Sequence, residues 1–270
     1  MARQAVFSVD LEPNKDDTME GVRDAMRWFD ETVPRGTVFA THRIAVEAPD
    51  LLAELASSHE IGVHVHPREF GHEHDQLAEL PPDRQRELIA QTRFEIADAV
   101  GTEPVSFRAG RHSASRETLR VLANLGFAVD ASLNVRYDEY LPKDISERSE
   151  PFELNGITEI PATHGELPTM SRCGVRALAE RPVTTTAATL RADRWGCRGL
   201  TAFMHLAKTF KFISFYMHPY DATNYHDLEN CGEMYRERME KVIERLDNNS
   251  VQFVTAENIS DLMDDGFDNI

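Results

Sequence analysis

Short apolar runs recur along the chain and alternate with longer segments that have helical periodicity. Strands are predicted at residues 4–10, 36–42, 60–67, 103–110, 127–132, 157–163 and 211–219, and at the start of 250–263. Helices are predicted at 16–33, 48–58, 81–100, 113–126 and about 232–246, with a short one at the end of 250–263. Serial strand–helix units of this kind favour parallel strands joined by crossover helices.

The repeated units carry no glycine-rich phosphate turn, so a barrel or distorted barrel fits them better than a dinucleotide-binding fold. The 270 residues contain no evident linker, which predicts a single domain over 1–270. The regular pattern loosens between residues 137 and 168, where one short strand is predicted. The fold class is therefore α/β.

Polar residues stand at the ends of six predicted strands, where burial would require each of them to find a partner. In a barrel of parallel strands these ends form the reaction face. The residues are Asp10 with Glu12, His42, His64 with His66, Arg108, Asp130 and His218. The pattern predicts a functional site at this face.

His64 and His66 lie two residues apart on one predicted strand, so both imidazoles face the same side. Two neutral imidazoles suit a divalent transition metal, and zinc is the metal we expect. Asp10 and Glu12 share a strand face in the same way, and together they offer one ligand and one proton acceptor. This set predicts metal-assisted hydrolysis, in which the ion lowers the pKa of a water molecule and a base takes its proton.

The formal net charge of −17 argues against nucleic acid or anionic lipid as a partner. Only five of the 29 basic residues are lysine, and this balance resembles the acidic proteins of salt-loving microbes. No apolar run approaches the roughly 20 residues that span a bilayer, and no secretory leader is evident at the start. These features predict a soluble, cytoplasmic protein whose three cysteines are reduced thiols.

Five motifs together resemble the polysaccharide deacetylase family of metal-dependent carbohydrate esterases, which includes chitin-oligosaccharide and peptidoglycan deacetylases. In chain order they are FSVDLE, HEIGVHVHP, SFRAGR, VDASL and SFYMHP. The resemblance spans about residues 6–220. It implies a distorted (β/α) barrel with about seven strands and hydrolysis of an N-acetyl group, or another C–N bond, in a sugar or small molecule.

The resemblance also implies roles for individual residues. Asp10 matches the general base, while Leu11 stands where family members carry a ligand aspartate, so Glu12 is the expected metal ligand. The family spaces its ligand histidines four apart, but Arg68 stands four residues after His64, which makes His66 the substitute.

Three further positions match catalytic residues of the family. Arg108 matches the arginine that holds the catalytic aspartate. Asp130 matches the aspartate that orients the acid histidine, and His218 matches that histidine, which protonates the departing amine. A carboxylate beside His218 would raise its pKa and keep it protonated near neutral pH.

Other polar and aromatic residues receive weaker assignments. Trp28 is expected in the core, Trp195 is a candidate for lining a sugar site, and His42 for contacting substrate. His72 and His74 are expected in an exposed loop, and His112 in a structural or exposed position.

The leading functional hypothesis is N-deacetylation of an amino sugar or glycan precursor. A small-molecule ureide or amide hydrolase of the same fold is an alternative, since fold does not fix substrate. A non-catalytic protein of glycan biosynthesis is another, favoured by Leu11 and Arg68.

Overall fold

The computed structural model describes residues 3–137, 139–165, 183–185, 191, 197–224 and 230–264. Within them a nine-stranded sheet runs in the order β10-β1-β2-β3-β4-β5-β7-β6, and β11 pairs with the start of β1. Its strands are β1 (Arg3–Leu11), β2 (Thr37–Ala40), β3 (Glu60–Val65), β4 (Ser106–Ala109), β5 (Val129–Asp130), β6 (Phe152–Leu154), β7 (Ile157–Glu159), β10 (Phe212–Met217) and β11 (Val251–Phe253). A separate pair joins β8 (His164–Gly165) to β9 (Val183–Thr184).

Every pairing in the large sheet is parallel except that of β6 with β7. Of its nine described strands, eight therefore run parallel, close to the predicted seven, and only the edge strand β6 is reversed. The predicted α/β barrel architecture is confirmed. The sequence pattern predicted one strand in the irregular region, whereas the structure has the hairpin of β6 and β7 there.

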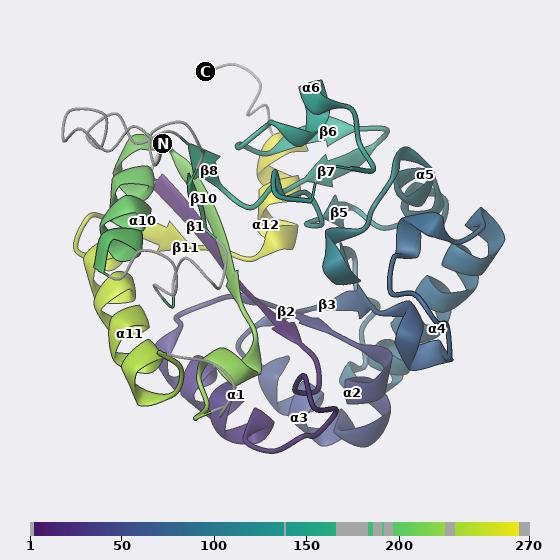
Figure 1. The fold of residues 1–270 in the computed structure, drawn as a ribbon, viewed down its shortest axis with the longest axis horizontal. Helices are drawn as coiled ribbons and strands as arrows, with labels where there is room; N and C mark the ends of the chain where they lie inside the picture. Colours follow the sequence, from purple (N-terminus) through teal and green to yellow (C-terminus); the bar gives the residue numbers. More distant parts are fainter. Residues whose placement is uncertain are drawn as a thin grey trace.

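The sheet curls into a distorted barrel (Figure 1). After β7 the chain approaches β10 at the far end of the sheet, where the amide of Thr163 donates to the carbonyl of Ser214 at 3.1 Å. The amide of Ser214 donates in turn to the Thr163 hydroxyl at 2.8 Å. An irregular segment, rather than a strand, thus links the two ends of the sheet.

The helices cover the outer face of the curled sheet, with α1 to α5 following the first strands and α10 and α11 flanking β10 (Figure 1). The helices of the described residues are α1 (Val22–Thr32), α2 (His42–Glu47), α3 (Pro49–Leu55), α4 (Pro82–Val100), α5 (Arg116–Asn124), α6 (Lys143–Ser146), α10 (Cys197–Thr209), α11 (Glu233–Asp247) and α12 (Ala256–Asp264). All five long helices predicted from periodicity are confirmed, four of them in shortened form and α11 at its predicted length.

Local capping explains where several helices begin and end. The Thr41 hydroxyl accepts from the amide of Ile44 and starts α2, so His42 opens a helix instead of closing the preceding strand as predicted. Ser115 and Thr118 form a capping box at the start of α5. Gly101 ends α4 with φ 77°, a left-handed conformation that costs glycine little.

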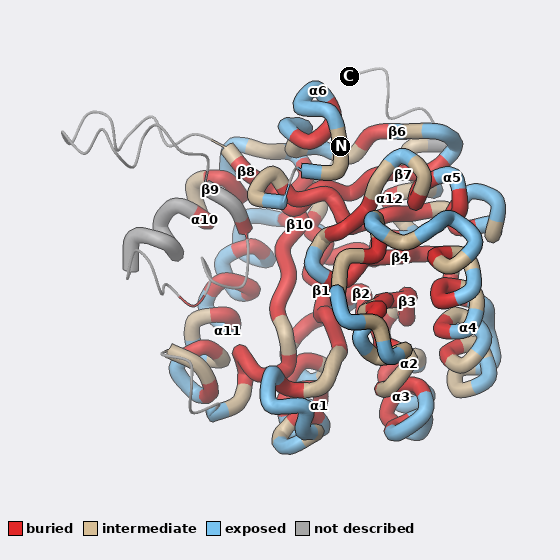
Figure 2. The backbone as a smooth tube through the Cα atoms, turned by 45° about the vertical axis from the view of Figure 1, so that its right-hand side comes forward, coloured by how far each residue is buried: buried red, intermediate tan, exposed pale blue. Residues whose placement is uncertain are grey.

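Two buried clusters occupy the two faces of the sheet. Odd-numbered residues of β1 pack outward against the helices in the larger cluster. Val6 of β1 joins Phe39, Phe212 and Ile259 of α12 in a second cluster, which fills the bottom of the barrel interior. Figure 2 shows the central strands of the sheet as almost entirely buried. The barrel floor is therefore apolar and closed by α12.

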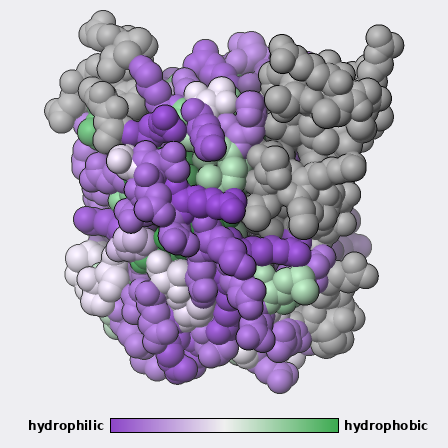
Figure 3. Space-filling model, turned by 90° about the vertical axis from the view of Figure 1, so that its left-hand side faces the viewer, coloured by the Kyte–Doolittle hydropathy of each residue, from purple (hydrophilic) through white to green (hydrophobic). Residues whose placement is uncertain are grey.

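Hydrophilic side chains dominate the described surface on the face shown in Figure 3, in keeping with the acidic composition. Trp28 is 7% exposed, so its predicted place in the core is confirmed. Trp195 and Cys173 lie outside the described residues. Across the described part of the chain, no helix has both the length and the apolar character needed to cross a membrane.

Candidate functional site

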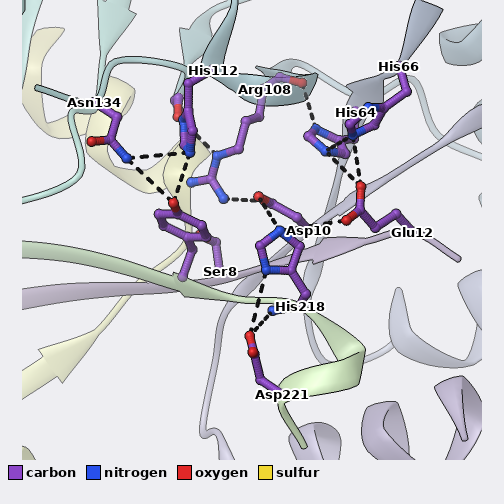
Figure 4. Close-up of polar contacts among 12 residues, drawn as sticks. Ser8, Asp10, Glu12, His64, His66, Arg108, His112, Asn134, His218 and Asp221 are labelled. Carbon is purple, nitrogen blue, oxygen red and sulfur yellow. Dashed lines mark hydrogen bonds and ion pairs between the residues drawn. The ribbon is translucent and has the colours of Figure 1, made fainter. Parts of the chain in front are cut away.

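Strand alternation places a column of side chains on the inner face of β1, above the apolar floor. Val6 belongs to the floor cluster, and Asp10 and Glu12 follow it on the same face at the carboxyl end. On β3, Val63 and Val65 pack outward, so His64 faces inward. The predicted convergence of the two acidic and two histidine residues is thus a direct result of the period-2 pattern (Figure 4).

Glu12, His64 and His66 form a cluster whose potential ligand atoms all lie within 4.8 Å of one another. Glu12 Oε2 is 2.8 Å from His66 Nε2 and 3.8 Å from His64 Nε2. The two Nε2 atoms are 3.1 Å apart. One carboxylate oxygen and two imidazole nitrogens therefore face a common point.

The opposite nitrogen of each ring is held by an oxygen acceptor, which fixes the orientation of the ring. His64 Nδ1 donates to the carbonyl of Arg108 at 2.8 Å, and His66 Nδ1 donates to Asp75 Oδ2 at 2.6 Å. A histidine that donates from Nδ1 to a carbonyl or carboxylate presents Nε2 as a metal ligand. Two such Nε2 atoms at 3.1 Å repel each other unless a proton or a cation lies between them, so the donor set fits a divalent ion.

The surroundings shift the pKa values of these three residues in different directions. Burial lowers the pKa of His64 to about 4. Burial also opposes a charge on His66, but Glu12 and Asp75 outweigh it and raise its pKa to about 10. Burial would raise the pKa of Glu12, but His66 lowers it overall. The carboxylates therefore favour positive charge at this point.

Gly110 makes room for the His66 ring. A Cβ atom added at Gly110 would lie 2.7 Å from both Cε1 and Nδ1 of His66, and 2.7 Å from the carbonyl oxygen of Val65. The backbone leaving β4 can approach the ring this closely only because the residue has no side chain.

Asp10 and Arg108 form a buried ion pair beside this cluster. Asp10 Oδ1 accepts from Arg108 Nη1 at 2.5 Å, and the two side chains are 4% and 3% exposed. Burial alone would raise the pKa of Asp10, but Arg108 and the neighbouring His64 and His218 hold it below its ordinary value. Asp10 is thus a carboxylate throughout the neutral range.

His218 follows β10 and projects toward the same centre (Figure 4). Its Nε2 lies 3.8 Å from Asp10 Oδ2 and 3.6 Å from Glu12 Oε1. Its Nδ1 faces Asp221 Oδ2 at 3.6 Å, and the same oxygen accepts from the His218 amide at 2.8 Å. Burial lowers the pKa of His218, but Asp221 and Glu12 raise it overall.

Asp221, rather than Asp130, is the carboxylate that the structure brings to Nδ1 of His218. Asp130 Oδ1 accepts from the amide and the hydroxyl of Ser132. Its neighbours Val129 and Ala131 belong to the floor cluster inside the barrel, so alternation turns Asp130 to the other face of β5. The resemblance implied that Asp130 orients His218. The structure does not support this role, because Asp130 lies on a two-residue strand and points away from the cavity.

A cavity of about 660 Å³ opens above the cluster and is lined by Asp10, Glu12, His64, His66 and His218. Further lining residues received no site role from the sequence, namely Lys15, Asp75, Arg111, His112, Tyr137, Tyr216 and Tyr220. Asp75 lies in the loop where only exposed histidines were predicted.

The weaker histidine assignments have mixed outcomes. The ring of His42 packs on Phe70 with centroids 4.8 Å apart and is not among the described residues that line the cavity. His74 is exposed, as expected for a loop residue, whereas His72 is half-buried and accepts from Arg84 at 3.0 Å. His112 lines the cavity instead of occupying a merely structural or exposed position.

Comparison with known proteins points to the family that the sequence motifs resemble. The polysaccharide deacetylase family model matches residues 14–129, a stretch that includes His64, His66 and Arg108. A search of curated proteins finds no match.

Three solved structures illustrate the similarity in fold. A proposed polysaccharide deacetylase from Mycobacterium smegmatis has a TM-score of 0.60 at 17% identity, covering 97% of this chain and 90% of that one. A variant of the peptidoglycan deacetylase PdaC from Bacillus subtilis has a TM-score of 0.55 at 11% identity, covering 98% and 93%. A family 4 carbohydrate esterase pseudoenzyme from Bacillus anthracis has a TM-score of 0.56 at 11% identity, covering 96% and 66%. At these identities the similarity establishes the fold.

Proposed function

We propose that the chain is a divergent member of the polysaccharide deacetylase family, whose model matches residues 14–129, and that it is a metal-dependent hydrolase that removes the N-acetyl group of an amino sugar in a glycan or glycan precursor. The observation that carries the proposal is the convergence of Glu12, His64 and His66 beside a buried carboxylate and a second histidine. That arrangement supplies ligands, a proton acceptor and a proton donor within one cavity.

Glu12, His64 and His66 would hold the divalent ion, and their mixed nitrogen and oxygen atoms suit zinc. When bound, the ion would polarise the amide carbonyl and lower the pKa of the attacking water. The carbonyl of Arg108 and the carboxylate of Asp75 keep both rings in the tautomer that presents Nε2. The two imidazole rings are thus already oriented before the reaction begins.

Asp10 is the proposed general base. Its carboxylate is ionised at neutral pH, lies within the cavity lining and is fixed by Arg108. Asp10 would accept the proton that the water loses as it attacks the amide carbon. Arg108 prevents Asp10 from holding that proton too tightly, so that Asp10 can pass it on.

His218 is the proposed general acid. Asp221 and Glu12 raise its pKa, which favours the protonated ring near neutral pH. From this position it can donate a proton to the nitrogen of the departing amine, which would otherwise be a poor leaving group. Asp221 is in turn anchored by Arg191, whose Nη1 donates to its other carboxylate oxygen.

Two measurements on the purified full-length chain test the proposal. Metal analysis should give one divalent ion per chain, lost in His64→Ala and His66→Ala and retained in the control His74→Ala, which alters an exposed histidine outside the cavity lining. Acetate release should be seen with N-acetylated amino sugars and should disappear in Asp10→Asn with the metal retained.

Other outcomes would overturn parts of the proposal. Release of ammonia or amine from small ureides without acetate from any sugar would support the small-amide hydrolase instead. Stoichiometric metal with no turnover of either class would support a non-catalytic role. Loss of metal in Asp10→Asn would reassign Asp10 as a ligand.

A further inference from the structure

A second cavity lies beside the proposed active site, between the loop that follows β1 and the start of α11. Its volume is about 520 Å³. Every second residue from Asn14 to Glu20 lines it, and so do Gly21 and Gly232, the N-cap residues of α1 and α11. Asn14 also lines the active-site cavity, two residues after Glu12. The two cavities therefore share the loop that follows β1.

The lining of this second cavity is acidic. Four of its described residues carry carboxylates, namely Asp16, Glu20, Asp24 and Glu233. Arg236 is the one cation in the described part of the lining, and its Nη2 donates to Asp24 Oδ2 at 2.5 Å. The amino ends of α1 and α11 each contribute only about half a positive charge. Among the described residues the balance of charge at this cavity favours a cation.

The loop gathers oxygen atoms around the terminal amide of Asn14. Asn14 Nδ2 lies 2.8 Å from the carbonyl oxygen of Glu20 and 3.2 Å from Thr18 Oγ1. Thr18 Oγ1 in turn lies 2.7 Å from Asp16 Oδ1. Oxygen atoms of these kinds, from carbonyl groups, carboxylates and neutral side chains, are the ligands of hard cations such as Ca²⁺.

The side chain of Asn14 is only half satisfied by these contacts. The residue is 6% exposed, and its Oδ1 is buried without a hydrogen-bond partner among the described residues. A buried oxygen without a partner is costly and indicates a missing ligand or water. Half a turn of the amide brings Oδ1 to the position of Nδ2, beside the carbonyl oxygen of Glu20. Two carbonyl oxygens share such a position favourably only when a donor or a cation lies between them.

The spacing along the loop is that of the first half of an EF-hand calcium loop. In such loops positions 1, 3 and 5 supply side-chain oxygens and position 7 supplies a backbone carbonyl. The residues with this spacing are Asn14, Asp16, Thr18 and Glu20. The second half departs from the motif, because Met19 stands in place of the glycine at position 6 and Ala25 in place of the glutamate at position 12. Binding weaker than in a complete loop is therefore expected.

We propose that this second cavity binds one calcium ion. Its ligands from the loop would be Asn14 Oδ1, a carboxylate oxygen of Asp16, Thr18 Oγ1 and the carbonyl oxygen of Glu20. This donor set contains only oxygen, whereas the cluster of Glu12, His64 and His66 offers nitrogens that suit zinc. The calcium ion would fix the loop that joins β1 to α1. The site is independent of the proposed deacetylase activity.

Calorimetric titration of the full chain, freed of metal with a chelator and then dialysed, tests the proposal. CaCl₂ and MgCl₂ are the two probes, at constant ionic strength. The wild type should bind one Ca²⁺ with a Kd on the order of 0.1–1 mM, the range of weakly charged calcium loops. Mg²⁺ should bind at least about tenfold more weakly, because it demands a stricter geometry and releases its water reluctantly.

Three variants locate the bound calcium. Asp16→Asn keeps the shape of the side chain and removes its charge, so it should weaken Ca²⁺ binding about tenfold or more. Asp98→Asn is the matched control, because Asp98 is exposed, loses the same charge and lies outside the lining of the second cavity. His64→Ala removes a nitrogen of the histidine cluster. Both Asp98→Asn and His64→Ala should bind Ca²⁺ as the wild type does.

Asn14→Asp separates a ligand from a merely structural residue. If Oδ1 binds the ion, the added charge should tighten Ca²⁺ binding about tenfold, a gain that unfolding cannot produce. If Asn14 serves only as a donor to the Glu20 carbonyl and to Thr18, the variant should lose stability in urea and gain no affinity.

That second result would overturn the proposal, as would a wild type without saturable Ca²⁺ binding. Equal losses in Asp16→Asn and Asp98→Asn would reduce the binding to a general attraction by the acidic chain. Loss of Ca²⁺ in His64→Ala with retention in Asp16→Asn would place the ion at the histidine cluster instead. Circular dichroism of each variant shows whether its fold is retained.

Discussion

Replacing Arg108 with methionine should destabilise the fold far more than the loss of an ordinary ion pair. The Arg108 side chain is 3% exposed and binds Asp10, which is 4% exposed. Its Nε donates to the carbonyl of Ala131 at 3.0 Å, and its guanidinium carbon lies 4.4 Å from the ring centroid of Phe39 and 5.1 Å from that of Tyr216. Methionine fills much of the volume but leaves the Asp10 carboxylate without a partner.

Removing one partner of a buried ion pair costs about 3–5 kcal/mol, because the other charge stays desolvated. Each guanidinium–ring contact adds about 0.5–2 kcal/mol, of which methionine recovers a part through packing. We therefore expect Arg108→Met to lower the free energy of unfolding by about 4 kcal/mol near pH 7. This is a large share of the roughly 5–15 kcal/mol typical of folded proteins.

The loss should depend on pH. In the wild type the folded pKa of Asp10 is depressed, so its contribution to stability is present above its ordinary value of 3.8 and is lost as pH falls toward the folded value. Without Arg108, the effect of burial on Asp10 loses the largest factor that opposes it, and only the weaker effects of the neighbouring histidines remain. The folded pKa should therefore rise, so the variant regains stability as pH falls. The difference between the two proteins should therefore be larger at pH 8 than at pH 5.

Urea unfolding of the chelator-treated proteins at constant salt measures this difference. Adding Asp10→Asn to Arg108→Met should restore about 2 kcal/mol, because it removes the unpaired charge. Arg23→Met is the control: Arg23 pairs with Asp50 on the surface, with exposures of 51% and 71%, and its loss should cost under about 1 kcal/mol. A double variant as unstable as Arg108→Met, with no pH dependence, would refute the reasoning.

Three further predictions follow from the surrounding carboxylates. Asp75→Asn should weaken zinc binding about 10- to 100-fold with the fold retained, measured by competition with a chelator, because it removes the acceptor that orients the His66 ring. Asp221→Asn should shift the alkaline limb of the pH–rate profile to lower pH, because His218 loses a group that raises its pKa and must be protonated to act. Burial raises the folded pKa of Glu159 well above 4.5, so wild-type stability falls as pH rises from the ordinary pKa toward the folded one. Glu159→Gln removes this titration, so in urea unfolding the variant should be more stable relative to the wild type at pH 8 than at pH 5.

The convergence of Asp10, Glu12, His64 and His66 could be predicted from the sequence because it depends mainly on strand alternation. Asp10 and Glu12, and likewise His64 and His66, lie two apart on strands that the apolar pattern defines clearly. Once parallel strands are assumed, their carboxyl ends must meet at one end of the barrel. The fold class and the central cluster follow from these two rules.

The supporting residues could not be predicted in the same way, because loops and turns place them. Asp75 lies in an irregular loop nine residues after His66, where neither periodicity nor capping indicates a direction. Asp221 belongs to the 3₁₀ turn after β10, and its carboxylate caps the His218 amide. The spacing of three residues after a strand-end histidine is the signal that could have suggested it.

Asp130 shows the limit of transferring roles by motif order. In a long strand the alternating pattern shows which side chains face inward. Strand β5 has only two residues, so the loops on either side decide which of them faces the cavity. Asp130 consequently faces away from the cavity and lies opposite Glu159 in the register of β5 with β7. Burial raises the pKa of Asp130 to about 7, which marks a carboxyl group that stays largely desolvated rather than one that stabilises a cation.

The closed floor of the barrel explains why the site gathers so much positive charge above it. Phe39 and the residues of α12 exclude water from beneath Asp10, and Arg108 lies directly on the Phe39 ring. In such surroundings the carboxylates of Asp10 and Glu12 cannot rely on solvent, so they are compensated by Arg108, His66 and His218. If the proposed divalent ion binds at Glu12, His64 and His66, it should therefore also stabilise the fold, because it binds the folded state through a carboxylate that has little access to solvent.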